Sequence, residues 1–262
     1  DAELVVGRLA RDGFVRTDDI GQADVILYYT CSVREHAEER VYGHLGALKR
    51  LKREKPETII GVMGCMAQNQ KEKILARAPH VDLIVGTSRF EEISSFLDDL
   101  THQKRVIAVD QGAVHYDRDV AQRPERHQAF VTIMRGCDKF CTFCIVPFTQ
   151  GRETSRPPED IEREVRALVD DGVVHVTLLG QRVNTYGLDL VRGESLATLL
   201  QRLEKIPGLR RLTFITSHPT HIDETLMRVI RDHPVHARYL HLPVQSGSNR
   251  VLQAMNRGYT AE

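Results

Sequence analysis

Residues 129–144, AFVTIMRGCDKFCTFC, decide the fold of the second half of the chain and the chemistry expected there. The apolar stretch Ala129–Arg135 predicts a β-strand. Three cysteines follow it with the spacing C-x3-C-x2-C, namely Cys137, Cys141 and Cys144. Because α/β folds gather their ligands at the carboxyl ends of strands, a cysteine cluster directly after a strand predicts a functional site.

The cysteine types and spacing point to an iron–sulfur cluster. Three thiolates on one short loop can hold three irons of a 4Fe-4S cube, and soft thiolate ligands suit such clusters. The fourth iron would then lack a protein ligand, which leaves a position open for a cofactor or substrate. The alternatives are a structural zinc site and three unrelated cysteines. Zinc sites favour a second C-x2-C pair, and none follows here.

Two further cysteines also follow predicted strands. Cys31 comes after the apolar run Ala23–Tyr29, and Cys65 comes after Thr58–Met63. In a parallel sheet both would lie at the same carboxyl edge, close enough to share a ligand. The alternative is a pair of buried structural cysteines, because free cysteines are often found in cores. The residues alone leave both alternatives open.

Both halves of the chain alternate predicted strands with predicted helices, which favours parallel sheets flanked by helices. The first half has strands at Ala23–Tyr29, Thr58–Met63 and Leu83–Val85, and helices at Val33–Lys55, Gln70–Ala78 and Phe90–Leu100. The second half has strands at Ala129–Arg135, Val173–Leu179, Arg211–Ile215 and Ala237–Leu242, and helices at Pro158–Asp171, Ser195–Glu204, Asp223–Asp232 and Ser248–Met255. A polar linker, Val109–His127, places a boundary near Arg123 and predicts domains over 1–122 and 123–262.

Composition narrows the class of protein. The chain has 262 residues, 41% hydrophobic and 27% charged, as is typical of soluble globular proteins. No apolar run approaches the roughly 18–20 residues that span a bilayer, so no membrane partner is expected. The 36 basic and 36 acidic residues balance, which gives no overall attraction to nucleic acid. Five cysteines without a signal peptide argue against a disulfide framework and favour a reducing compartment.

Several longer stretches carry a resemblance to a known family. They are Tyr29–Gly43, Gly61–Gln68, Phe130–Pro158, Leu178–Gly187, Thr216–Pro219 and His241–Glu262. Together they make the chain resemble the radical-SAM methylthiotransferase family over essentially its whole length. The resemblance implies an N-terminal parallel-sheet methylthiotransferase domain followed by a truncated radical-SAM partial (β/α) barrel. The segments CSVRE and GVMGCMAQ resemble the branch that acts on isopentenylated adenosine in tRNA.

The resemblance also implies cofactors. SAM would bind the open iron of the 4Fe-4S cluster held by the cysteine triplet, and electron transfer from the cluster would cleave it to a deoxyadenosyl radical. In the family three further cysteines hold a second 4Fe-4S cluster, to which Cys31 and Cys65 would contribute here. Asp1 resembles the segment just after the first of those three, so the third ligand would lie before it and the chain is expected to be a fragment.

Other polar residues fall near the predicted strand ends. Within the family the segment after the cysteine loop lies near the active site, and strand-end amides there can hydrogen-bond SAM or substrate. The candidate cofactor-binding residues are Arg152, Glu153, Gln181, Asn184, Gln245 and Ser246. The alternative is that these residues form turns and a solvated loop. His218 is likewise either a ligand or a turn residue. The basic run Lys49–Lys55 could contact RNA, but a solvated helix face is the simpler interpretation.

The resulting hypothesis is a cytoplasmic, SAM-dependent radical methylthiotransferase. It would add a methylthio group to carbon 2 of isopentenylated adenosine next to the tRNA anticodon, using tRNA and an external electron donor as partners. The alternatives within the family are threonylcarbamoyl-adenosine in tRNA and an aspartate of a ribosomal protein. The alternative from another class is a non-catalytic iron–sulfur protein, which would usually ligate all four irons itself.

Overall fold

The computed structural model describes residues 1–32, 35–110, 126–190 and 193–262. These residues fall into two compact units, which are described separately below. Unit 1 comprises residues 1–122 and 148–150, and unit 2 comprises 123–147 and 151–262. Most of the predicted linker, together with the boundary expected near Arg123, lies outside the described residues.

Unit 1 is built on a parallel sheet with the strand order β1-β2-β3-β4. Its strands are β1 (Val25–Thr30), β2 (Ile59–Gly64), β3 (Leu83–Val85) and β4 (Val106–Ala108). The buried positions of β2 and β3 are mostly aliphatic, as expected of parallel strands covered on both faces. The prediction missed β4, whose three residues are too few to show a periodic pattern.

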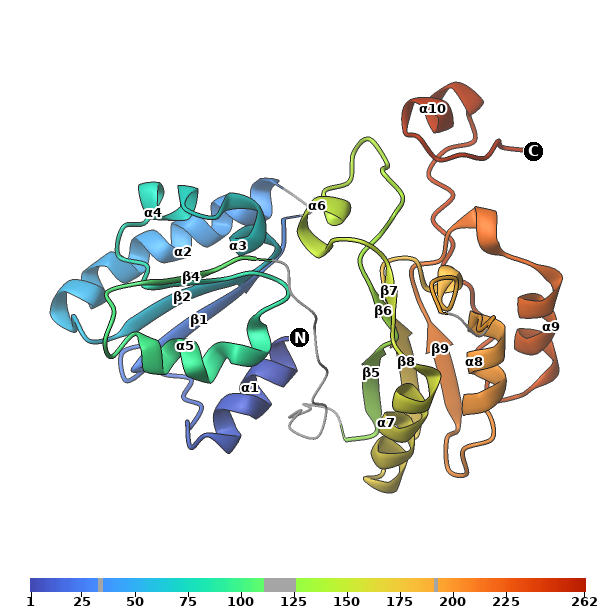
Figure 1. Ribbon diagram of the computed structural model, residues 1–262, viewed down its shortest axis with the longest axis horizontal. Helices are drawn as coiled ribbons and strands as arrows, with labels where there is room; N and C mark the ends of the chain where they lie inside the picture. The colour runs from blue at the N-terminus through green and yellow to red at the C-terminus, as the bar shows by residue number, and fades with distance from the viewer. Residues whose placement is uncertain (33–34, 111–125, 191–192) are drawn as a thin grey trace. The chain divides into compact units, whose positions relative to one another are not determined.

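Helices cover both faces of this sheet (Figure 1). One face carries α2 (Glu35–Glu54), α3 (Cys65–Gln70) and α4 (Lys73–Arg77), and the other carries α1 (Ala2–Arg11), η1 (Phe90–Glu92) and α5 (Ile93–Asp99). Two hydrophobic clusters result, one containing Leu45 and Ile60 and the other containing Leu4 and Phe96. The predicted helix Gln70–Ala78 is wrong in its bounds, because a left-handed Lys71 (φ 48°) separates α3 from α4.

Unit 2 contains a three-stranded parallel sheet with the order β5-β8-β9 and a separate two-stranded antiparallel ladder, β6-β7. The strands are β5 (Gln128–Thr132), β6 (Met134–Arg135), β7 (Thr154–Ser155), β8 (His175–Leu179) and β9 (Arg211–Phe214). The helices are α6 (Val146–Gln150), whose last three residues belong to unit 1, α7 (Pro158–Asp170), η3 (Val183–Thr185), α8 (Leu196–Leu203), η4 (Pro219–His221), α9 (Glu224–Asp232) and α10 (Asn249–Ala254).

Two helices of unit 2, α8 and α9, begin at residues whose side chains cap them. Ser195 caps α8 through its hydroxyl, which accepts from Thr198 N at 3.2 Å, and the Thr198 hydroxyl accepts from Ser195 N in return. Asp223 caps α9 by accepting from Leu226 N at 2.7 Å. Each such cap stabilises its helix by about 1 kcal/mol. Neighbouring helices α7, α8 and α9 pack in sequence order over one continuous core.

The predicted strand Ala237–Leu242 is wrong. This segment forms only an isolated parallel bridge to β9, between Leu212 and His236. Tyr239 N donates to Ala237 O at 2.7 Å, and this tight turn interrupts the pairing, which resumes only beyond β9, where His241 O accepts from Ser217 N at 3.1 Å. Among the described helices, none is both long enough and apolar enough to cross a membrane.

Candidate functional site

The cysteine loop of unit 2 starts from the β6-β7 ladder, where Gly136 makes a close approach possible. Gly136 has φ 72°, and a Cβ there would lie 1.9 Å from Arg152 O. Cys137 N then donates to Gly151 O at 3.1 Å, which continues the contact between the two arms of the loop. The predicted strand Ala129–Arg135 is in fact two strands, β5 in the parallel sheet and β6 in the ladder, and Cys137 is held just after the second of them.

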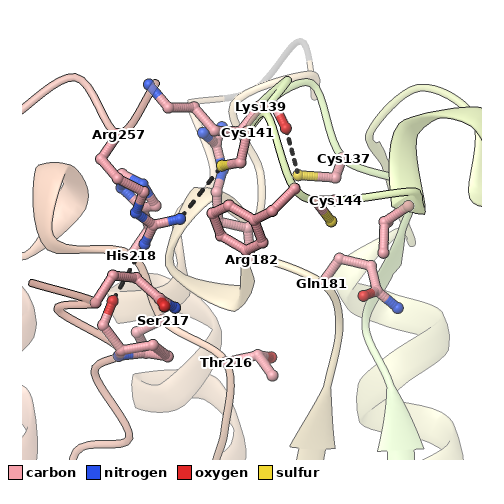
Figure 2. Close-up of a pocket in the computed structure, with 14 residues that line it drawn as sticks. Cys137, Lys139, Cys141, Cys144, Gln181, Arg182, Thr216, Ser217, His218 and Arg257 are labelled. Atoms are coloured by element: carbon pink, nitrogen blue, oxygen red, sulfur yellow. Dashed lines mark hydrogen bonds between the residues drawn. The ribbon is translucent and has the colours of Figure 1, made fainter. Parts of the chain in front are cut away.

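All three cysteines of the triplet line one pocket of about 160 Å³ (Figure 2). Cys137 and Cys141 are buried and Cys144 is half-buried, and none is in a disulfide. Burial raises the pKa of the Cys137 thiol, so its thiolate needs a positive partner such as a metal ion. Three soft donors on one loop, opening into one pocket, fit the iron–sulfur cluster that the spacing predicts.

The other walls of the pocket come from the carboxyl ends of the neighbouring strands. Gln181 and Arg182 follow β8, and Thr216, Ser217 and His218 follow β9. The remaining lining residues are Lys139, Phe143, Val146, Pro243, Gln245 and Arg257. The pocket therefore combines thiols, amides and three cationic side chains, which suits a ligand with a carboxylate or phosphate group.

Two lining residues are held in an unfavourable backbone conformation. Thr216 and Gln245 both have φ 67°, a region that a β-branched residue such as threonine rarely occupies. Thr216 is kept there by two hydrogen bonds, from its N to His241 Nδ1 at 3.0 Å and from its hydroxyl to Gly180 O at 2.6 Å. Such strain concentrates at functional sites, where the surrounding structure imposes it.

His218 enters the pocket as a neutral imidazole. Burial, reinforced by Arg257 and Arg182, lowers the pKa of His218 to about 4. Its Nδ1 lies 2.8 Å from the Thr220 hydroxyl, while Nε2 is buried with no hydrogen-bond partner among the described residues. A buried, unpaired ring nitrogen is available to a ligand in the pocket.

Asn184 fixes the backbone of His218 rather than lining the pocket. Its amide donates to His218 O at 2.7 Å, and its carbonyl accepts from His218 N at 2.8 Å. Both halves of the amide are therefore used within the protein. Asn184 positions a pocket residue, and direct contact between Asn184 and SAM stays a prediction.

Glu153 and Arg152 have different surroundings although they are adjacent. Glu153 is nearly buried, pairs with Arg182 Nε at 3.0 Å and accepts from the Thr185 hydroxyl at 3.1 Å. It thus braces the cysteine loop against the end of β8. Arg152 is 81% exposed and pairs with Asp138 at 2.9 Å. Neither lines the pocket, so their predicted role in cofactor binding stays a prediction.

The two glutamines predicted as cofactor ligands, Gln181 and Gln245, do line the pocket. Ser246 does not, and its hydroxyl accepts from Ser248 N at 3.1 Å in the turn that precedes α10. The strand-end argument therefore identified pocket residues after β8 and in the segment after β9, together with one turn residue.

The sequence analysis did not identify two of the residues that line the pocket, Arg182 and Arg257. Arg182 directly follows Gln181, so the same strand-end argument could have found it. Arg257 had no local signal, because its contact with the loop joins residues 116 apart: Arg257 Nη1 donates to Cys141 Sγ at 3.3 Å. A second bond from Nη2 to Pro243 O at 3.1 Å holds the guanidinium in place.

In unit 1, Cys31 and Cys65 lie at one edge of the sheet. Thr30 pairs with Gly64 at the ends of the parallel strands β1 and β2, and each cysteine is the next residue along the chain. Gly64 has φ 91°, and a Cβ there would lie 2.5 Å from Thr30 O, so only glycine allows this approach. Cys31 is exposed and Cys65 half-buried. Shared metal ligation by Cys31 and Cys65 stays a prediction.

The comparisons with known proteins agree with this geometry. Residues 131–262, half of the chain, match the family model described as the radical SAM superfamily. The chain belongs to the radical SAM superfamily. Its first part, residues 1–86, matches the model described as uncharacterized protein family UPF0004.

Eight curated relatives of this radical SAM protein carry the name tRNA-2-methylthio-N(6)-dimethylallyladenosine synthase. The protein from Dictyoglomus thermophilum is 45% identical over 99% of this chain and 59% of its own length. Those from Caldicellulosiruptor saccharolyticus and Agrobacterium fabrum are each 46% identical over the whole chain, covering 56% and 60% of their own lengths. The predicted resemblance to the methylthiotransferase family is confirmed, and the chain spans under two thirds of these relatives.

Solved structures support the fold. The radical S-adenosylmethionine methyltransferase TsrM from Kitasatospora setae, solved with cobalamin and a 4Fe-4S cluster bound, matches with a TM-score of 0.64 at 13% identity. The match covers 98% of this chain and 58% of that one. The same enzyme with its tryptophan substrate and a SAM analogue gives 0.62 at 14% identity, covering 98% and 59%. The predicted fold class, parallel α/β with a radical SAM domain, is confirmed.

Proposed function

We propose that the protein containing this chain is a SAM-dependent radical methylthiotransferase that acts on carbon 2 of N(6)-dimethylallyladenosine in tRNA. One observation carries the proposal: three thiols and the amides of Gln181 and Gln245 line one pocket of a radical SAM chain. That chain is 43–46% identical to proteins named for the product of this reaction. tRNA is the proposed partner, with an external electron donor and a cytoplasmic location, where thiols stay reduced.

Different residues of the pocket would bind the cluster and SAM. Cys137, Cys141 and Cys144 would hold the 4Fe-4S cluster, which supplies the electron for reductive cleavage of SAM when both are bound. Gln181, which follows β8, and Gln245, in the segment before α10, can both hydrogen-bond the polar groups of SAM. These side chains fix the position and orientation of the ligand, which is the protein's main contribution in cofactor chemistry.

Cationic side chains at the pocket complement an anionic ligand. Lys139 and Arg182 both line it, and Arg182 is oriented by its ion pair with Glu153. Arg257 donates to Cys141 Sγ, and this bond would stabilise negative charge on the thiolate. Hydrogen bonds to cluster sulfurs are among the features that set a reduction potential.

A second cluster at Cys31 and Cys65 belongs to the same proposal. Their adjacent strand ends support shared ligation, and Cys65 Sγ already accepts a hydrogen bond from Gln150 Nε2 at 3.2 Å within unit 1. Of the five cysteines in the sequence, the triplet uses three, so these two remain for the second cluster.

The test separates the two cysteine sets. The protein containing this chain is reconstituted anaerobically with iron and sulfide, then incubated with reductant, SAM and tRNA carrying N(6)-dimethylallyladenosine. Mass spectrometry follows deoxyadenosine and the methylthio nucleoside. Cys137→Ala should abolish both products, whereas Cys31→Ala should retain deoxyadenosine and lose the methylthio nucleoside.

Two results would contradict the proposal. Methylthio product formed at the wild-type rate by Cys137→Ala would remove the triplet from the reaction. Equal loss of deoxyadenosine in Cys31→Ala and Cys137→Ala would contradict separate roles for the two cysteine sets. The exposed residue His102 provides a control, and His102→Ala should leave both products unchanged.

A further inference from the structure

A second group of potential metal ligands lies in unit 2 at the opposite ends of its strands. Glu204 directly follows α8, and His233 directly follows α9. His236 pairs with Leu212, the second residue of β9, and so lies beside the amino end of that strand. The cysteine pocket, by contrast, uses residues that follow the carboxyl end of β9.

The three side chains converge closely. One potential ligand atom from each lies within 4.8 Å of the other two. His236 Nε2 is 2.8 Å from Glu204 Oε2, and the two imidazole rings meet edge to face with centroids 5.8 Å apart. A tetrahedral zinc ion with bonds of about 2.0–2.1 Å places its ligand atoms roughly 3.3 Å apart. Small side-chain rotations would therefore bring the three atoms into coordination distance.

The position of His236 decides which of its ring nitrogens could bind zinc. The residue is 5% exposed, and its Nε2 lies 2.8 Å from Glu204 Oε2. A zinc ion bound by both residues would therefore contact His236 through Nε2. The ring proton would then lie on Nδ1, which has no hydrogen-bond partner among the residues described.

We propose that Glu204, His233 and His236 form a zinc site that joins the ends of α8 and α9 to the start of β9. Two imidazoles and one carboxylate are a ligand set that zinc uses in proteins. The Glu204 side chain is 18% exposed and His233 is half-buried, which leaves an entry path and room for water as a fourth ligand. The site lies at the strand end away from the cysteine pocket, where α/β barrels place stabilising rather than catalytic contacts.

The simpler alternative is that Glu204 and His236 form only a hydrogen bond. His233 distinguishes the two interpretations, because that hydrogen bond does not involve it. Glu204→Gln also separates them, since a glutamine can still accept a hydrogen bond from His236 but binds zinc poorly.

The test uses the protein with its iron–sulfur clusters in place, so that the cysteines are occupied. Chelator-treated protein is exposed to zinc chloride and passed over a gel-filtration column. Retained zinc is then measured, and its X-ray absorption edge shows the ligand types. We expect one zinc ion per chain in a shell of nitrogen and oxygen only, and a zinc-dependent rise in the melting temperature of unit 2.

Variants complete the test. His233→Ala and Glu204→Gln should each weaken zinc binding by more than about 100-fold, since changes outside the direct ligands alone cost about 10- to 100-fold. His102→Ala, an exposed histidine of unit 1, should bind zinc like the wild type. Zinc lost on the column from the wild type, zinc retained equally by His233→Ala and Glu204→Gln, or sulfur in the shell would each overturn the proposal.

Discussion

Replacing Glu153 by glutamine tests whether the cysteine loop depends on its brace to the end of β8. The Glu153 carboxylate accepts from Arg182 Nε at 3.0 Å, from Arg182 Nη2 at 3.2 Å and from the Thr185 hydroxyl at 3.1 Å. Glu153→Gln keeps the size of the side chain and removes its charge. It therefore leaves the Arg182 guanidinium buried without a counter-charge.

The expected loss of stability in Glu153→Gln depends on how deeply the ion pair between Arg182 and Glu153 is buried. Removing one partner of a buried ion pair costs about 3–5 kcal/mol. Arg182 and Glu153 keep 13% and 10% of their side-chain surface exposed, so solvent screens part of the remaining charge. The glutamine oxygen can also accept one of the original hydrogen bonds. We therefore expect the free energy of unfolding of unit 2 to fall by about 2–3 kcal/mol.

The assay must report on unit 2 by itself, because a chain with two units need not unfold in one step. Urea unfolding followed by hydrogen exchange of peptides from β8 and β9 does so. The control is Arg152→Gln, which breaks the exposed ion pair between Arg152 and Asp138 and should cost at most about 1 kcal/mol. Equal losses for Glu153→Gln and Arg152→Gln would refute the brace.

Three further predictions concern the pocket itself. Gly136→Ala should prevent iron binding by the triplet, because the new Cβ would clash with Arg152 O. The control is Gly172→Ala, which is also at positive φ (92°) but has no atom within 4 Å of its Cβ, and this variant should bind iron normally. The iron content after reconstitution measures the difference. NMR titration of His218 should give a pKa near 4. Because the pKa in the unfolded chain is about 6.5, protonation favours the unfolded state, and the free energy of unfolding should fall as the pH drops from about 6.5 to about 4. A pKa near 6.5 would contradict burial as its cause. Arg257→Met should lower the reduction potential of the triplet's cluster, because Cys141 Sγ loses a donor, and an unchanged potential in a redox titration followed by electron paramagnetic resonance would refute that role.

The sequence was most informative where local pattern and site coincide. The strand before Cys137 and the three-cysteine spacing needed only neighbouring residues, and the structure places all three cysteines in one pocket. The parallel order of β1 and β2 likewise follows from short aliphatic runs, which is why Cys31 and Cys65 could be placed at one edge.

Sequence reasoning failed where distant contacts decide the structure. The segment after His236 has strand-forming residues, yet the turn at Tyr239 ends its pairing with β9 after one bridge. No pattern within a short window could show that Arg257 reaches Cys141, or that Glu153 is taken by Arg182 instead of facing the pocket. Side-chain partners across more than a few positions depend on packing, which local propensity does not encode.

The amide of Asn184 has a consequence for the width of the pocket. It exchanges two hydrogen bonds with the backbone of His218, just as one peptide group would with another in a ladder. The Asn184 side chain thus joins the segments after β8 and β9 in the way that a backbone peptide group joins two paired strands. Aspartate lacks the donor and glutamine is one methylene longer, so neither can imitate a peptide group here. Together with the bonds from the Thr216 hydroxyl to Gly180 O and from Val183 N to Thr216 O, this asparagine fixes the spacing between the segments after β8 and β9, so a substitution of Asn184 is expected to change the size of ligand that the pocket accepts.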